Sequence, residues 1–162
     1  MRVLGIDPGI QRTGYAVLER NGSSVRVLDA GVISTTTRAA LPERLVEIDT
    51  HLECILTENR PELVAVESLY AHYRHPRTAI LMGHARGIVL LAAARHGLAV
   101  HDLAATQVKQ SVTGNGRASK LQVQRAVQIC LDLAELPSPP DVADACAVAL
   151  TALQMVMVGG RR

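Results

Sequence analysis

Residues 2–9, Arg-Val-Leu-Gly-Ile-Asp-Pro-Gly, carry the strongest local signal for the fold. Its apolar run stops at an acid, a proline and a glycine, which is typical of a buried strand that ends in a turn. Residues 14–18 and 25–33 have the composition of two further strands, and Asn21-Gly22 between them is a hairpin signal. The chain is therefore predicted to open with a three-stranded antiparallel meander.

Helices and short strands are predicted to alternate after this meander. The segments 42–59, 78–95, 119–133 and 141–157 have helical character, with Pro42 suited to a first turn and Ser119 to an N-cap. Residues 63–67 and 99–103 have the composition of strands. This order predicts an α/β fold with a mixed five-stranded sheet, antiparallel and then parallel, and helices on both faces. We expect a single domain over residues 1–158 and a short basic tail over residues 159–162.

Composition excludes several classes of protein. The chain has 162 residues, a mass of 17.3 kDa and 48% hydrophobic residues, which is enough for one core of ordinary size. Its three cysteines are isolated, which argues against a disulfide framework or a Cys-rich zinc site. The first apolar run is too short for a signal peptide, and residues 88–94 fall far short of the ~20 residues of a membrane span. We therefore expect a soluble cytoplasmic protein with no membrane partner.

Positive charge is concentrated in the second half of the chain. Residues 70–125 contain eight Lys or Arg and one acid, a net charge of +7, whereas the rest of the chain carries −5. Such a segregated region indicates binding to a phosphate backbone, although a solvated helical face would have the same composition. The only two lysines, Lys109 and Lys120, flank the Gly-rich segment 114–116. Lysine acts on phosphate as a point charge, so we predict that both contact phosphates; the alternative is that they are ordinary surface residues.

Four carboxylates are candidates for one shared site. Asp7 ends the first strand and Glu67 ends the fourth, so the two emerge at the same rim if these strands are neighbours. Asp141 and Asp144 are spaced i, i+3 on one face at the start of the last helix. Each has a simpler explanation: Asp7 as a turn residue, Glu67 as a solvated strand end, and Asp141 as an N-cap with Asp144 completing a capping box.

Together, the four carboxylates would repel one another unless divalent cations neutralised them. Oxygen ligands of this kind select Mg²⁺ or Mn²⁺. Two such ions about 3.5–4 Å apart can activate water and stabilise the leaving oxygen in phosphodiester cleavage. Beside a basic segment, this chemistry points to nucleic acid as the substrate.

Five motifs, in this order and at this spacing, resemble the RuvC family, bacterial Holliday-junction endonucleases of the ribonuclease H-like superfamily. The motifs are GIDPGIQRTGYAV (5–17), AVES (65–68), GHARGI (83–88), QVKQSVTGNGRASKLQVQ (107–124) and DVADACAVALT (141–151). The chain departs from the family pattern at Tyr70, where Phe is usual, at Ser68 in place of Gln and at Cys146 in place of Leu. The ring of Tyr70 can still stack on a base.

The resemblance implies a structure-selective endodeoxyribonuclease that resolves four-way DNA junctions by paired symmetric nicks. It implies two Mg²⁺ ions per subunit, with Mn²⁺ as an alternative, held by a catalytic tetrad of Asp7, Glu67, Asp141 and Asp144. Lys109 and Lys120 would hold phosphates, and further DNA contacts are expected from Tyr70, Arg74, Arg77 and Arg117. The family also implies a homodimer and cooperation with the RuvA–RuvB branch-migration complex.

The helix at residues 78–95 independently favours a dimer, because it is apolar over more of its circumference than packing on a sheet requires. Burial between the first and third helices of the monomer is the alternative.

Three other functions are consistent with parts of the sequence. GIDPGxxxxGYAV also resembles the phosphate-binding hairpin of the actin and sugar-kinase superfamily, but that fold needs two domains and this chain is short. A junction-binding protein without catalysis would not need four placed carboxylates. A ribonuclease H-like nuclease that acts on RNA–DNA hybrids is disfavoured only by the family match.

Overall fold

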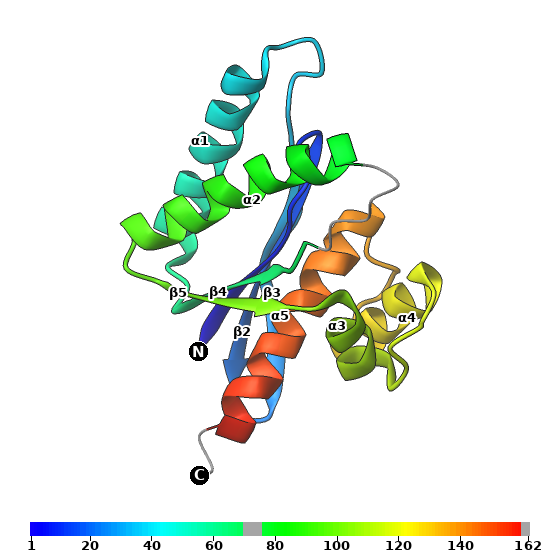
Figure 1. Cartoon of the computed structure of the whole chain (residues 1–162). Helices are drawn as coiled ribbons and strands as arrows, with labels where there is room; N and C mark the ends of the chain where they lie inside the picture. Colours follow the sequence, from blue (N-terminus) through cyan, green and yellow to red (C-terminus); the bar gives the residue numbers. More distant parts are fainter. Residues whose placement is uncertain (70–75, 160–162) are drawn as a thin grey trace.

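The fold is a five-stranded mixed sheet with helices on both faces, as predicted (Figure 1). The computed structural model describes residues 1–69 and 76–159. In chain order the elements are β1 (Arg2–Asp7), β2 (Arg12–Asn21), β3 (Ser24–Ser34), α1 (Leu41–Asn59), β4 (Leu63–Glu67), α2 (Pro76–Arg95), β5 (Ala99–Leu103), α3 (Ala105–Thr113), α4 (Lys120–Cys130) and α5 (Pro140–Gly159). The strand order is β3-β2-β1-β4-β5.

The strand pairing matches the predicted change from antiparallel to parallel. The pairs β1–β2 and β2–β3 are antiparallel, whereas β1–β4 and β4–β5 are parallel. In the β1–β4 ladder Ile6 lies opposite Val66. Because the next residues are Asp7 and Glu67, both carboxylates leave the sheet at the same rim, which was the condition set by the sequence analysis.

The pleat of the central strands divides the core into two layers. Val3 of β1 packs with α3, α4 and α5, whereas its neighbours Leu4 and Ile6 pack with α1 and α2. The same alternation occurs in β2, where Leu18 joins the first layer and Val17 the second. The central strands are apolar on both faces because both faces are covered.

The segment between β5 and α4 contains a helix that the sequence analysis did not predict. Residues 105–113 form α3, and of their side chains only that of Val108 is fully buried. Ala104 occupies the N-cap without a side-chain hydrogen bond, so this helix lacks a capping signal. Its apolar side is short and consists mainly of Val108 and Val112, which pack on the core. By contrast, Ser119 caps α4 as predicted, because its Oγ accepts a hydrogen bond from the Gln122 amide at 3.3 Å.

The last helix lies unusually close to the sheet. A Cβ added at Gly5 of β1 would lie 2.6 Å from the Ala149 nitrogen and would also collide with the Ala145 carbonyl oxygen, both of α5. A Cβ at Gly14 of β2 would collide with the backbone of Asp141, at the start of the same helix. Glycine in the strands and alanine in the helix therefore permit the approach that sets the first turn of α5 beside the end of β1.

This packing predicts a strong effect of Gly5→Ala. The added methyl group meets backbone atoms, which cannot rotate away, so α5 must shift as a unit. We expect the free energy of unfolding to fall by about 3 kcal/mol, at the upper end for overpacked cores. Urea unfolding would measure this change, and a loss below about 1 kcal/mol would show that α5 is not held by this contact.

Candidate active site

Three of the four candidate carboxylates line one cavity. The cavity has a volume of about 300 Å³, and its charged residues are Asp7, Glu67, Asp144, Lys109 and Lys120. They come from five elements: the ends of β1 and β4, the second turn of α5, the first turn of α4, and the middle of α3. Apolar side chains complete the lining, namely Met82, Ala105, Val108, Val123 and Ala147. The fold therefore gathers acids and lysines that are up to 137 positions apart in the sequence.

The surroundings of this cavity make it unfavourable for all of its carboxyl groups to be ionised at the same time. Burial is the main factor that raises the pKa of Asp7 from its usual value of 3.8 to about 7, and nearby Glu67, Asp144 and Asp141 raise it further. Burial also raises the pKa of Glu67 and of Asp144. Lys120 acts in the opposite direction on all three carboxyls. An excess of buried negative charge is the condition that a bound cation relieves.

Asp141 is placed differently from the other three. Helix α5 begins at Pro140, so Asp141 lies inside its first turn and not at the N-cap, which does not match the alternative explanation of Asp141 as a capping residue. The Asp141 carboxylate forms an ion pair with Arg12, at 3.0 Å between Nη2 and Oδ2. It lies close enough to raise the pKa of Asp7, yet it is not among the residues that line the cavity.

The donor chemistry of this cluster fits a hard divalent cation. All four side chains offer carboxylate oxygens, which suit Mg²⁺ and Mn²⁺ better than softer metals. As the side chains stand, no three His, Cys, Asp or Glu residues within residues 1–69 and 76–159 are arranged to hold one ion together. Two of the carboxylates are instead paired with cationic side chains, Asp141 with Arg12 and Asp144 with Lys120 at 3.8 Å.

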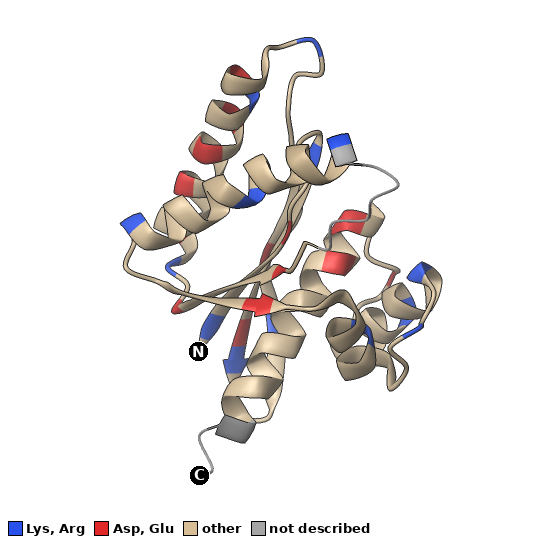
Figure 2. Cartoon of the chain, in the orientation of Figure 1, with Lys and Arg blue, Asp and Glu red and all other residues tan. Residues whose placement is uncertain are grey.

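The two lysines line the cavity from either side of an ordered turn. Figure 2 shows that Lys and Arg occur on α3, on α4 and on the segment between them. Gly114 ends α3 in the left-handed conformation, with φ of 73°, and the Gln110 side chain bonds the backbone of Gly114 and Gly116. The Lys120 side chain is 78% exposed, so its ammonium group is accessible to a substrate. The two lysines that flank the Gly-rich turn in the sequence therefore both place a positive charge at the same cavity.

Two other predicted DNA contacts, Arg77 and Arg117, are not among the described residues that line the cavity. Arg77, near the start of α2, and Arg117, in the turn between α3 and α4, are both exposed. Tyr70 and Arg74 lie outside the described residues. No local pattern in the sequence indicated a role for Arg12, because its partner Asp141 lies 129 positions away.

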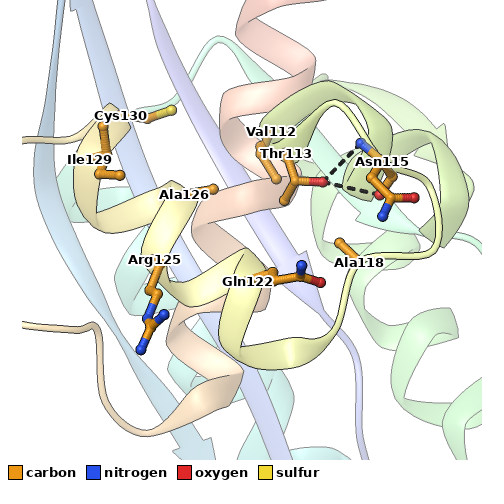
Figure 3. A pocket seen from close by; sticks show the side chains of 9 residues that line it. All are labelled: Val112, Thr113, Asn115, Ala118, Gln122, Arg125, Ala126, Ile129 and Cys130. Carbon is orange, nitrogen blue, oxygen red and sulfur yellow. Dashed lines mark hydrogen bonds between the residues drawn. The ribbon is translucent and has the colours of Figure 1, made fainter.

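A second cavity lies on the other side of α4 (Figure 3). It has a volume of about 360 Å³, and Thr113, Asn115, Gln122 and Arg125 are its polar residues. The Thr113 hydroxyl accepts a hydrogen bond from the Asn115 amide at 3.1 Å and lies 3.0 Å from the Asn115 carbonyl oxygen. No carboxylate lines this cavity, so it lacks the ligands for a cation and the groups for acid–base chemistry.

Comparison with known proteins gives a consistent result. The family model "Crossover junction endodeoxyribonuclease RuvC" matches residues 3–152. A protein of that name from Rhodopirellula baltica is 50% identical over 148 residues, which cover 91% of this chain and 83% of the relative. Another from Heliobacterium modesticaldum is 48% identical over 150 residues, 93% of this chain and 92% of the relative.

Solved structures agree with these sequence matches. Thermus thermophilus RuvC, in complex with a Holliday junction substrate, superposes with a TM-score of 0.91 at 38% identity, over 98% of this chain and 96% of that one. The yeast mitochondrial Holliday junction resolvase Ydc2 shares the fold, with a TM-score of 0.65 at 16% identity, over 93% of this chain and 76% of that one.

The raised pKa of Asp7 predicts how metal-free stability depends on pH. The folded state holds a proton on Asp7 up to about pH 7, whereas the unfolded state loses it near 3.8, so stability falls as pH rises through this window. Asp7→Asn removes the buried charge. We expect the variant to exceed wild type in free energy of unfolding by up to about 4 kcal/mol near pH 8, and by little near pH 4.

Urea unfolding in the presence of a chelator would measure this difference. Equal stability of the two proteins near pH 8 would mean that the Asp7 carboxylate is not penalised by its surroundings.

Proposed function

The chain belongs to the RuvC family of crossover junction endodeoxyribonucleases, and we propose that it resolves four-way DNA junctions by hydrolysing phosphodiester bonds at the cavity of Asp7, Glu67 and Asp144. The observation that carries the proposal is the convergence of three carboxylates and two lysines in one open cavity. The match to a relative solved with a Holliday junction supports a junction as the substrate. We further propose that residues 1–158 act as one nuclease domain in the cytoplasm.

The proposed metal ligands are Asp7, Glu67, Asp141 and Asp144, and the proposed cofactor is two Mg²⁺ ions per subunit, with Mn²⁺ as an alternative. Bound ions of this type supply an activated water and a Lewis acid for the leaving oxygen. Asp7 and Glu67 lie on neighbouring parallel strands, so their separation is set by the sheet. Asp144 is held by the close packing of α5, which makes the donor positions independent of any loop.

The proposed role of Lys109 and Lys120 is to stabilise the negative charge that develops on the phosphate under attack. Both side chains line the same cavity as the carboxylates and lower the pKa of Glu67 and Asp144, so their charge is felt at the reaction site. The exposed Arg77 and Arg117, with Tyr70 and Arg74, are proposed to contact the flanking DNA.

A homodimer is proposed to use the exposed face of α2. An 18-residue window of this helix has a mean hydropathy of 1.2 but is only 22% buried, whereas the comparable window of α5 is a core segment. Ile80 and Leu91 remain 62% and 45% exposed, so α1 and the sheet cover one face of the helix and leave these apolar residues of the other face uncovered. A two-fold dimer would present two equivalent sites to the two equivalent strands of a junction, which gives paired symmetric nicks.

Sedimentation at micromolar protein would test the dimer directly. A mass of 17.3 kDa would contradict it, and twice that mass would support it. Cooperation with the RuvA–RuvB branch-migration complex is proposed from the family resemblance.

Junction cleavage should require each proposed metal ligand. With Mg²⁺, the wild-type protein should nick a synthetic four-way junction in preference to a linear duplex, and a chelator should stop the reaction. The following changes should each slow nicking by about 100-fold or more, while junction binding persists because the basic residues supply most of the affinity: Asp7→Asn, Glu67→Gln, Asp141→Asn and Asp144→Asn.

The exposed acid Glu135 offers a matched control, since Glu135→Gln removes the same charge outside the cavity. Near-wild-type nicking by the Asp7 or Glu67 variant would refute the proposed mechanism.

Lysine substitution should slow the chemical step itself. We expect Lys109→Ala or Lys120→Ala to reduce the nicking rate at saturating junction by about 10-fold to 100-fold, because charge beside the transition state is lost. Single-turnover kinetics over a range of DNA concentrations would measure this, with Arg38→Ala as an exposed control. Full recovery of the rate at high DNA concentration would mean that both lysines contribute to DNA binding and not to the chemical step.

A further inference from the structure

The ion pair between Arg12 and Asp141 joins the first residue of β2 to the first turn of α5 at the edge of the cavity. The pair is partly open to solvent, with side-chain exposures of 50% and 31%. The contact is a single one, at 3.0 Å between one guanidinium nitrogen and one carboxylate oxygen. Exposed pairs of this type contribute little to stability, so the contact can be exchanged for another at small cost.

The backbone of Asp141 has little freedom to move. Its carbonyl group packs against Gly14 of β2 so closely that a Cβ on Gly14 would lie 2.7 Å from the Asp141 carbonyl carbon. The Asp141 side chain therefore changes its contacts mainly by rotation about its own torsions. In the structure it faces Arg12, and a rotation away from Arg12 would be needed to bring its carboxylate to the cavity that Asp7, Glu67 and Asp144 line.

From this geometry we infer that Arg12 is a positioning residue that holds Asp141 outside the cation site of the DNA-free protein and competes with the divalent cation for its carboxylate. The inference rests on the proposed function, because it takes Asp141 as a metal ligand. It explains why Asp141 is absent from the cavity lining although it is near enough to act on Asp7. Divalent cations would thus enter the complete four-carboxylate site only when Arg12 releases Asp141.

Binding of Mn²⁺ to the DNA-free protein, measured by isothermal titration calorimetry, tests this competition without relying on catalysis. Asp141→Asn should weaken one binding step and so identify the step that involves Asp141. Arg12→Gln should tighten that step by about two- to five-fold, the range expected for loss of an exposed ion pair. Arg12→Lys retains the charge and should stay closer to wild type.

A double-mutant cycle separates direct competition from general electrostatics. In the Asp141→Asn background, Arg12→Gln should have no further effect on Mn²⁺ affinity. The matched control Arg38→Gln removes the same charge from an exposed residue of the β3–α1 loop and should leave the affinity unchanged.

Two results would overturn the inference while leaving the proposed function intact. In the first, Asp7→Asn and Asp141→Asn bind Mn²⁺ more weakly than the wild type, as the proposed function expects, but Arg12→Gln binds Mn²⁺ no more tightly than the wild type. The other is an equal gain from Arg12→Gln with and without Asp141, which would mean that Arg12 acts only through its long-range charge. Failure of the proposed function has a different signature, in which Asp7→Asn and Asp141→Asn bind Mn²⁺ like wild type.

Discussion

The close packing of α5 on β1 and β2 is the constraint on which the candidate site depends. Gly5 and Gly14 leave no side chain between the helix and the sheet, and α5 meets them with small residues such as Ala145 and Ala149. This backbone contact holds the first turn of α5 beside the end of β1. The carboxylates are therefore kept together by packing, although their charges repel one another.

Because packing holds the carboxylates close together, their negative charges must be neutralised by nearby groups. A buried group of carboxylates is costly unless protons, cationic side chains or metal ions neutralise it. The structure shows the first two solutions: a pKa of about 7 for Asp7, and ion pairs of Asp144 with Lys120 and of Asp141 with Arg12. Divalent cations would neutralise these carboxylates more strongly than a proton or a single ion pair does, so the cavity is suited to bind them.

The two faces of the sheet differ in what they contribute: one supplies most of the charged residues of the cavity, and the other is mainly a packing layer. The face covered by α3, α4 and α5 contributes most of the charged residues of the cavity, while the chain segment between α3 and α4 carries the exposed Arg117. The face covered by α1 and α2 is largely a packing layer, although Met82 of α2 reaches the cavity. Its outer surface on α2 is apolar and exposed, which suits a protein partner better than DNA. This separation would allow a dimer to form without obstructing either cavity.

Local signals in the sequence were sufficient to predict the strands and most of the helices. Periodicity, the Asn21-Gly22 hairpin and the cap at Ser119 act within a few residues, and the structure confirms each. Local signals were too weak to predict α3, because the helix is short, lacks a side-chain cap and has few apolar residues to pack against α4 and α5. The motifs in the sequence also identified the family, since they preserve residue order and spacing.

The assembly of the candidate site depends on long-range contacts, which become visible in the folded structure. The pairing of β1 with β4 placed Asp7 beside Glu67, a relation that the sequence could state only as a condition. The sequence also assigned Asp141 to an N-cap or to a metal, whereas the structure pairs it with Arg12, 129 positions away. Contacts over such separations depend on how whole elements pack, and no local propensity records them. The raised pKa of Asp7 has the same origin, because burial and neighbouring charge exist only once the chain has folded.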